Sequence, residues 1–124
     1  MDSQCRMRVT GLVKTGEGKG KAMGSPTANL DVAVDLEPGV YAAWTHHLDT
    51  RLESVVCYGV RDPAGKQKFE VHILDYAGDL YGRELSVEII GERLSGLQDL
   101  THDEMVKKIE SDIRLARAAL KHYV

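Results

Sequence analysis

The sequence predicts a mainly β domain, an antiparallel barrel or sandwich, followed by one C-terminal α-helix. Short apolar runs rich in Val, Ile and Tyr are separated by turn-rich breaks, which is typical of antiparallel sheets. The end of the chain instead repeats apolar residues at intervals of three and four, which is typical of an amphipathic helix. The six predicted strands are Met7–Lys14, Ala28–Val34, Val40–His47, Leu52–Val60, Lys68–Asp75 and Glu84–Gly91.

Turns and alternation support these strands. Glu37-Pro38-Gly39 and Asp62-Pro63-Ala64-Gly65 are turn signals between neighbouring runs. The clearest alternation lies in Lys68–Asp75, because side chains of a strand point to opposite faces in turn. One face of that strand carries Phe69, Val71 and Ile73, and the other carries Glu70, His72 and Leu74.

The final segment predicts a helix that begins near Thr101. Thr101 followed by Glu104 is a capping-box pattern. The helix would end near Lys121 and His122, whose positive charge suits the helix dipole. Its apolar stripe is Met105, Ile109, Ile113, Ala116 and Leu120. No repeat or linker interrupts the chain, so residues 1–124 are predicted to form a single domain.

Composition excludes several classes of protein. The 124 residues carry a formal net charge of −3, which argues against a nucleic-acid-binding face. The two cysteines, Cys5 and Cys57, have no paired spacing and are expected to be free thiols, with Cys57 packed in the interior. The N-terminus has no signal-peptide pattern, and no apolar run reaches membrane-spanning length. A cytoplasmic location is the prediction.

The richest stretch for chemistry is the glycine- and lysine-rich segment 16–30. Gly18 and Gly20 would let the backbone approach a ligand closely, and Lys19 and Lys21 carry the charge that a polyphosphate requires. The segment matches neither a Walker A loop nor a dinucleotide fingerprint. By composition alone, a glycine-rich hairpin and a phosphate-binding loop fit it equally well.

Two polar residues follow that loop at strand spacing. Pro26 favours extended backbone before it, so Thr27 and Asn29 would point the same way. A hydroxyl and an amide oxygen side by side suit Mg²⁺, a hard ion that usually arrives with substrate phosphates. Taken without further context, the pattern favours the alternative that both residues cap a turn.

Four segments in order resemble the riboflavin kinase (flavokinase) family. They are Gly-Lys-Ala-Met-Gly-Ser-Pro-Thr-Ala-Asn-Leu at 20–30, Pro-Gly-Val-Tyr-Ala at 38–42, Glu-Val-His-Ile-Leu-Asp at 70–75 and Asp-Leu-Tyr-Gly-Arg-Glu-Leu at 79–85. The resemblance covers about residues 8–120. In bacteria this module commonly forms the C-terminal half of a bifunctional riboflavin kinase/FMN adenylyltransferase.

The resemblance implies a fold and an activity. The fold is a six-stranded antiparallel Greek-key β-barrel with a C-terminal amphipathic helix. The activity is ATP-dependent, Mg²⁺-assisted phosphorylation of riboflavin at the ribityl 5′-hydroxyl, giving FMN and ADP. The implied site residues are Glu70 as the base, Thr27 and Asn29 as Mg²⁺ ligands, Gly18, Gly20 and Lys21 in the phosphate loop, and Tyr81 beside the nucleotide.

The sequence also departs from the family pattern. Ser25 stands where the family has Phe, and Gly91–Thr101 lacks the Arg-x-x-x-Lys-Phe character expected before the final helix. These departures motivate an alternative, a non-catalytic flavin- or nucleotide-binding paralogue that acts as a sensor or interaction module. The expected partners are riboflavin or FMN and ATP or ADP, without nucleic acid or membrane. The chain is expected to be a monomer or a module of a larger flavin-biosynthesis enzyme.

Four further residues receive ordinary structural interpretations. His72 shares the face of Glu70 but is typical of a surface histidine. Tyr41 and Trp44 are predicted core aromatics rather than a flavin platform, and Arg117 is predicted to decorate the helix rather than to contact a ligand.

Overall fold

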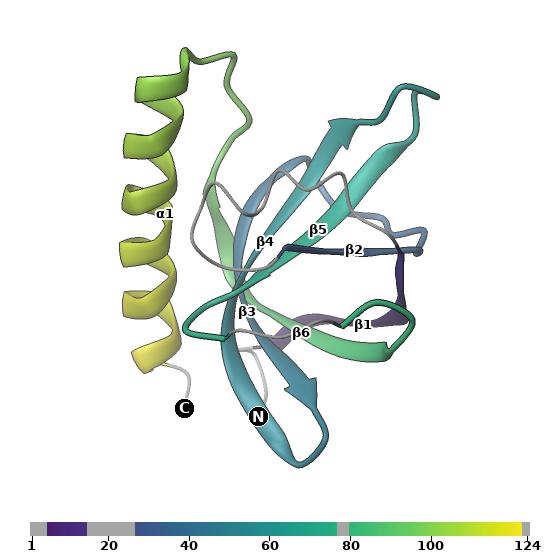
Figure 1. Cartoon of the computed structure of the whole chain (residues 1–124). Helices are drawn as coiled ribbons and strands as arrows, with labels where there is room; N and C mark the ends of the chain where they lie inside the picture. Colours follow the sequence, from purple (N-terminus) through teal and green to yellow (C-terminus); the bar gives the residue numbers. More distant parts are fainter. Residues whose placement is uncertain (1–4, 15–26, 77–79, 123–124) are drawn as a thin grey trace.

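The computed structural model describes residues 5–14, 27–76 and 80–122, and within them six strands close into a barrel with one helix outside it (Figure 1). The elements are β1 (Cys5–Lys14), β2 (Thr27–Leu30), β3 (Gly39–His47), β4 (Thr50–Arg61), β5 (Gln67–Ile73), β6 (Glu84–Ser95) and α1 (His102–His122). No helix in the described part of the chain is long and apolar enough to cross a membrane.

The strand order around the barrel is β1-β2-β5-β4-β3-β6, with every neighbouring pair antiparallel. β3, β4 and β5 form a meander, and β2 lies beside β5, which is a Greek-key arrangement. Pairing of β1 with β6 closes the barrel. The predicted mainly β fold with a C-terminal helix is therefore confirmed, and the structure is a barrel rather than the alternative sandwich.

Alternating side chains divide the apolar residues between two cores. The barrel interior contains Phe69, Val71 and Ile73 of β5, as the alternation predicts, together with side chains from the other strands such as Val56 and Leu85. A second core lies on the outside of the barrel under α1, where Val40, Ala42, Trp44, Val55, Leu74 and Ile90 meet Ala116 and Leu120. This outer core fixes the helix against β3, β4 and β6.

The helix begins with the predicted capping box. The Thr101 backbone N–H donates to Glu104 Oε1 at 3.0 Å, and the Glu104 backbone N–H donates to Thr101 Oγ1 at 3.3 Å. Only the C-terminal half of the predicted apolar stripe is fully buried, because Ala116 and Leu120 are both 0% exposed while Met105 is 38% exposed. The N-terminal half of α1 therefore stands over the barrel without complete contact.

The predicted strand Ala28–Val34 ends earlier, at Leu30. The Val32 backbone N–H donates to the Leu30 carbonyl at 3.1 Å, a three-residue turn that takes the chain out of the sheet. The β-branched residues beyond Leu30 alternate as a strand would, but they have no ladder partner, so their propensity alone does not extend β2.

The predicted end of the last strand at Gly91 is also wrong, because β6 continues to Ser95. Gly91 has φ +69°, and the pairing with β3 shifts between Ala42↔Ile90 and Val40↔Ser95. This irregularity bends β6 and lets the strand resume its pairing. Gly39 allows the close approach, since a Cβ there would lie 2.7 Å from the Ser95 carbonyl oxygen.

Replacing Thr101 with alanine is expected to destabilise the protein by about 1 kcal/mol, because the N-cap oxygen would be lost from the first turn of α1. Urea unfolding followed by circular dichroism measures this change. Thr101→Ser keeps the hydroxyl and should retain most of the stability. Equal stability of Thr101→Ala and the parent would show that the cap is unimportant.

Candidate functional site

Four polar side chains project from one face of the β2–β5 pair. The register pairs Thr27 with His72 and Asn29 with Glu70. Directly opposed residues of an antiparallel pair have Cβ atoms about 5 Å apart. Ala28 and Val71, which alternate with them, point into the barrel core. The sheet thus gathers a hydroxyl, an amide, an imidazole and a carboxylate into one polar cluster.

Three atoms of this polar cluster are buried without a hydrogen-bond partner among the described residues. They are Thr27 Oγ1, Asn29 Oδ1 and His72 Nε2. Asn29 and His72 are only 8% and 7% exposed, so water does not freely replace the missing partners. A buried polar atom without a partner costs free energy and needs an explanation. In the described part of the chain Thr27 and Asn29 lie within β2 rather than at a turn, and neither side-chain oxygen has a partner there.

The polar cluster lies at one end of an apolar groove between the barrel and the N-terminal half of α1. Thr27, Glu70 and His72 line the groove directly. Most of the rest of its lining is apolar and comes from Val40, Val55, Val60, Leu97, Met105, Ile109 and Ile113. The partial exposure of Met105 follows from this groove, because its side chain faces a hollow and not the barrel. Such a slot can hold a flat apolar ring system next to a polar end.

Electrostatics distinguish the residues in the groove. The Glu70 carboxylate lies 3.9 Å from the Lys68 ammonium, a long ion pair in which both side chains are mostly shielded from water. Burial lowers the pKa of His72, so the imidazole is neutral near pH 7. Burial, reinforced by the nearby Glu70 charge, raises the pKa of Cys57 to about 11. Cys57 is therefore a protonated packing thiol, although it lines the groove rather than the barrel interior.

A second hollow is lined in part by Asn29 and carries three lysine side chains, each within 4 Å of a carboxylate. Lys14, Lys66 and Lys68 line it together with Asn29 and Asp62. At its rim, Asp31 is 3.2 Å from the Lys66 ammonium and 3.8 Å from that of Lys14. The hydrogen bond and charge of Lys66 lower the pKa of Asp31, so this carboxylate stays ionised. The sequence analysis missed this basic recess, since only the strand order β1-β2-β5 brings the three lysines together.

The remaining predicted site residues have different outcomes. Gly18, Gly20 and Lys21 lie outside the described residues, as does Ser25. Tyr81 lies in the turn before β6, is 64% exposed, and does not line the apolar groove.

The structural interpretations are confirmed in part. Tyr41 and Trp44 are buried as predicted. His72 is not a surface histidine, because it is only 7% exposed and lines the groove. Arg117 is not mere helix decoration, since its guanidinium binds Glu53 at 2.6 Å and Asp75 at 3.1 Å. These ion pairs join the helix to β4 and to the turn after β5.

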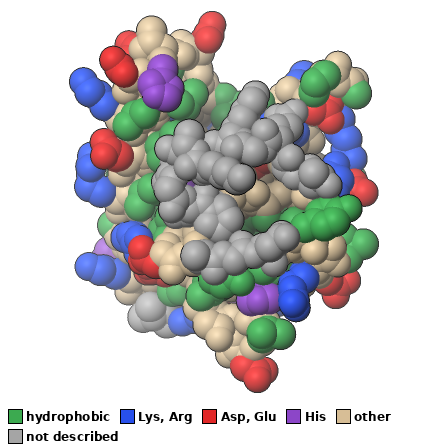
Figure 2. All heavy atoms as spheres, in the orientation of Figure 1, with side chains coloured by type: hydrophobic (Ala, Val, Ile, Leu, Met, Phe, Trp, Pro, Cys, Tyr) green, Lys and Arg blue, Asp and Glu red, His purple; other side chains and the backbone are tan. Residues whose placement is uncertain are grey.

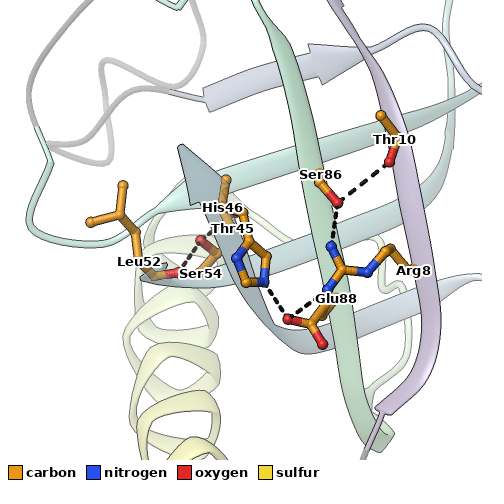
Figure 3. A network of polar contacts seen from close by, with 8 residues as sticks. All are labelled: Arg8, Thr10, Thr45, His46, Leu52, Ser54, Ser86 and Glu88. Carbon is orange, nitrogen blue, oxygen red and sulfur yellow. Dashed lines mark hydrogen bonds and ion pairs between the residues drawn. The ribbon is translucent and has the colours of Figure 1, made fainter. Parts of the chain in front are cut away.

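Another polar network lies on the β1–β6–β3 face of the barrel and differs from the candidate site. There Arg8 and His46 both bind the Glu88 carboxylate, and Ser86 accepts from Arg8 (Figure 3). These contacts link side chains of β1, β3 and β6 to one another, so the network stabilises the barrel. The side of the molecule seen in Figure 2 has acidic and basic side chains interspersed around its edge, which agrees with the absence of basic excess in the sequence.

Comparison with known proteins identifies the family. The family model described as "Flavokinase: Riboflavin kinase" matches residues 3–120. The chain belongs to the riboflavin kinase family. This confirms the resemblance drawn from the four sequence segments.

Individual relatives agree with membership of the riboflavin kinase family. The chain is 35% identical over 117 residues to the bifunctional riboflavin kinase/FMN adenylyltransferase of Pseudomonas fluorescens, covering 90% of this chain and 37% of that protein. The corresponding protein of Escherichia coli K12 is 33% identical over 114 residues, which cover 88% of this chain and 36% of that protein. The chain thus spans about a third of the length of the curated relatives it matches.

Two solved structures share the fold. A macrolide-efflux protein from Streptococcus pneumoniae superposes with a TM-score of 0.76 at 26% identity, covering 89% of this chain and 38% of that chain. Riboflavin kinase from Trypanosoma brucei superposes with a TM-score of 0.64 at 17% identity, covering 92% of this chain and 79% of that chain. At that identity the second likeness supports the fold alone.

The burial of His72 predicts a pH dependence of stability. Because folding lowers the pKa of His72 below its usual 6.5, the unfolded chain binds more protons than the folded chain in the window just below pH 6.5. Stability contributed by the neutral imidazole is therefore complete above pH 6.5 and is lost as the pH falls towards the folded pKa. Urea unfolding at pH 7.5 and 5.5 should show a smaller loss for His72→Gln than for the parent, with the exposed His122→Gln as control. An equal loss in His72→Gln and the parent would contradict the assignment.

Proposed function

We propose that this chain transfers the γ-phosphoryl group of ATP to the ribityl 5′-hydroxyl of riboflavin, producing FMN and ADP with the help of Mg²⁺. The observation that carries the proposal is the pair of unpartnered buried oxygens, Thr27 Oγ1 and Asn29 Oδ1, beside Glu70 at the end of an apolar groove. Membership of the riboflavin kinase family gives this arrangement its chemical meaning.

The apolar groove supports the flavin half of the reaction. A flat isoalloxazine ring would lie between the barrel side chains Val40 and Val55 and the helix side chains Ile109 and Ile113. Its ribityl chain would then extend along the groove towards Glu70. Packing of Ala116 and Leu120 on the barrel holds the helix side of the groove in place, so helix docking and substrate binding would be linked.

The polar cluster and the basic recess support the phosphate half. Among the described residues no group of three or more His, Cys, Asp or Glu side chains could hold a metal ion. Thr27 and Asn29 instead offer two neutral oxygens, which fits Mg²⁺ delivered with phosphates and retaining waters. When bound there, Mg²⁺ would supply neutralisation of phosphate charge.

Other basic groups would hold the rest of the polyphosphate. The recess beside Asn29 offers Lys14, Lys66 and Lys68 to the phosphate groups of ATP. Gly18, Gly20 and Lys21 of the glycine-rich segment, and Tyr81 at the nucleotide, are further members of the proposed site. All of these contacts position the donor and stabilise charge, which is the main contribution of a protein to phosphoryl transfer.

In the proposed mechanism, Glu70 accepts the proton of the riboflavin 5′-hydroxyl and orients that oxygen. The 5′-oxygen forms a bond to the γ-phosphorus, the bond between that phosphorus and the β–γ bridging oxygen breaks, and the electron pair leaves with ADP. Neutral His72, opposite Thr27 in the register, would present its unpartnered Nε2 to the same polar end. Positioning and a general base together account for the residue types present.

The proposal includes a cytoplasmic single-domain kinase module, which can operate within a larger flavin-biosynthesis enzyme. Bifunctional relatives support that last element. The grouping of Thr27, Asn29 and Glu70 in one cluster supports the kinase over the alternative of a non-catalytic paralogue.

Replacing Glu70 with glutamine should reduce FMN formation by about 10²- to 10⁴-fold, because the general base would be lost without a change of shape. FMN is followed by chromatography with riboflavin, ATP and Mg²⁺, and ADP binding is measured by calorimetry. The parent should form FMN and stop when Mg²⁺ is chelated. Glu84→Gln, at an exposed position of β6, is the matched control. Undiminished turnover in Glu70→Gln would remove Glu70 from the mechanism.

Replacing Thr27 with valine should separate stability from function. Valine has a similar shape and removes a buried hydroxyl that has no partner among the described residues, so the melting temperature should stay the same or rise. The Mg²⁺ concentration for half-maximal FMN formation should rise about tenfold or more, because a metal ligand is lost. Thr50→Val, at an exposed strand end, is the control. A lower melting temperature with unaltered Mg²⁺ dependence would indicate that Thr27 is structural.

A further inference from the structure

A nearly buried ion pair lies inside the apolar groove and has no assigned role in the reaction. Lys108 Nζ lies 2.7 Å from Asp112 Oδ2, and the two side chains are 15% and 9% exposed. Both residues line the same groove as Glu70. Lys108 lies in the N-terminal half of α1 and Asp112 at the middle of the helix, on the side that faces the end of β6.

The hydrogen bonds of this pair do not use all of its donor and acceptor positions. Ser95 Oγ donates to Asp112 Oδ1 at 2.8 Å, and Lys108 Nζ donates to Ser95 Oγ at 2.9 Å. An ammonium has three donors and a carboxylate about four acceptor positions. Among the described residues, two donors of Lys108 are engaged, which leaves a third N–H. Asp112 likewise keeps acceptor positions next to that N–H.

Anchoring the helix does not require charges at this position. Farther along α1, apolar packing of Ala116 and Leu120 holds the helix to the barrel. A buried ion pair is often no more stabilising than apolar residues of similar volume. A charged pair in an otherwise apolar groove therefore suggests recognition of a polar group on the ligand.

The register places the ion pair at a distance from the reacting end that suits the substrate. Glu70 of β5 pairs with Cys57 of β4, Cys57 pairs with Val40 of β3, and Val40 pairs with Ser95 of β6. Ser95 in turn hydrogen-bonds to both Lys108 and Asp112. Three strand spacings amount to about 14 Å. Cys57, which lies on this path between Glu70 and Val40, also lines the groove. A ribityl chain followed by the pyrimidine half of an isoalloxazine ring spans a comparable length.

We propose that Lys108 and Asp112 recognise the pyrimidine-dione edge of the flavin ring, an inference that rests on the proposed function. That edge carries carbonyl oxygens on either side of an N–H. Lys108 would donate to a ring carbonyl, and Asp112 would accept from the ring N–H. The opposite, dimethylbenzene edge is apolar and suits Met105 and Leu97. The pair makes the groove specific for an oriented flavin, because an unpaired polar edge would be penalised on burial.

The test uses lumiflavin, which has the isoalloxazine ring without the ribityl chain and cannot be phosphorylated. Binding is followed by flavin fluorescence in the parent and in the double variant Lys108→Met/Asp112→Leu. The double variant replaces the ion pair with apolar side chains and should fold with similar stability. Its Kd for lumiflavin and its KM for riboflavin should both rise on the order of 10- to 100-fold, with an unchanged KM for ATP. Lys107→Met, at the exposed neighbouring position, is the control.

A merely structural ion pair predicts the opposite result, since a more apolar groove would bind the ring equally well or better. Unchanged lumiflavin affinity in the double variant would overturn the proposal. So would weaker riboflavin binding with unchanged lumiflavin binding, because the pair would then contact the ribityl chain.

A second measurement needs no variant. The parent should bind N3-methyllumiflavin with a Kd at least about tenfold higher than that for lumiflavin. The methyl group replaces the hydrogen of the ring N–H from which Asp112 would accept a hydrogen bond. Equal affinity for the two compounds contradicts the proposal. A parent that binds lumiflavin selectively but forms no FMN would refute the kinase activity and leave ring recognition standing. A parent that forms FMN without binding lumiflavin would refute ring recognition and leave the kinase activity standing.

Discussion

The register between β2 and β5 is the constraint on which the candidate site depends. β2 has only four residues, and its pairing with β5 sets Thr27 opposite His72 and Asn29 opposite Glu70. A slip of one residue would turn the polar side chains into the barrel and expose Ala28 and Leu30. Burial of those two apolar residues, at 5% and 2% exposure, opposes the slip. The hydrophobic core therefore holds the polar cluster in place.

The structure separates elements that stabilise from elements that bind. The barrel interior is apolar and closed, and the C-terminal half of α1 packs on its outer face through Ala116 and Leu120. The polar cluster of β2 and β5 contains buried atoms that have no partner in the described part of the chain, which lowers stability. Such atoms are tolerated because the closed barrel and the docked half of the helix supply stability elsewhere. The incompletely buried N-terminal half of α1 borders the groove, so one helix both completes the fold and bounds the site.

Sequence patterns predicted the features that depend on local chemistry. The alternation of β5 and the Thr101–Glu104 cap needed only neighbouring residues, and both were confirmed. The ends of β2 and β6 were wrong, because a turn at Leu30 and an irregularity at Gly91 are set by tertiary pairing. The burial of His72 also depends on what covers its strand. The basic recess and the Ser95–Lys108–Asp112 contacts join residues far apart in sequence, so no local pattern could reveal them.

The two hollows meet at β2, and this gives the proposed reaction a direction. Thr27 lines the apolar groove, whereas Asn29 lines the basic recess. Residues two apart in a strand are separated by about 6.6 Å, and their side chains share one face. A flavin hydroxyl in the groove and a polyphosphate in the recess would therefore approach each other across a single pair of residues. Glu70, opposite Asn29 and also in the groove, lies on the hydroxyl side of that boundary. A carboxylate there can accept a proton from the hydroxyl while the lysines of the recess keep the phosphate charge on the other side. In the proposed reaction, the short β2 strand would thus separate an apolar substrate from an anionic one and bring their reacting ends together.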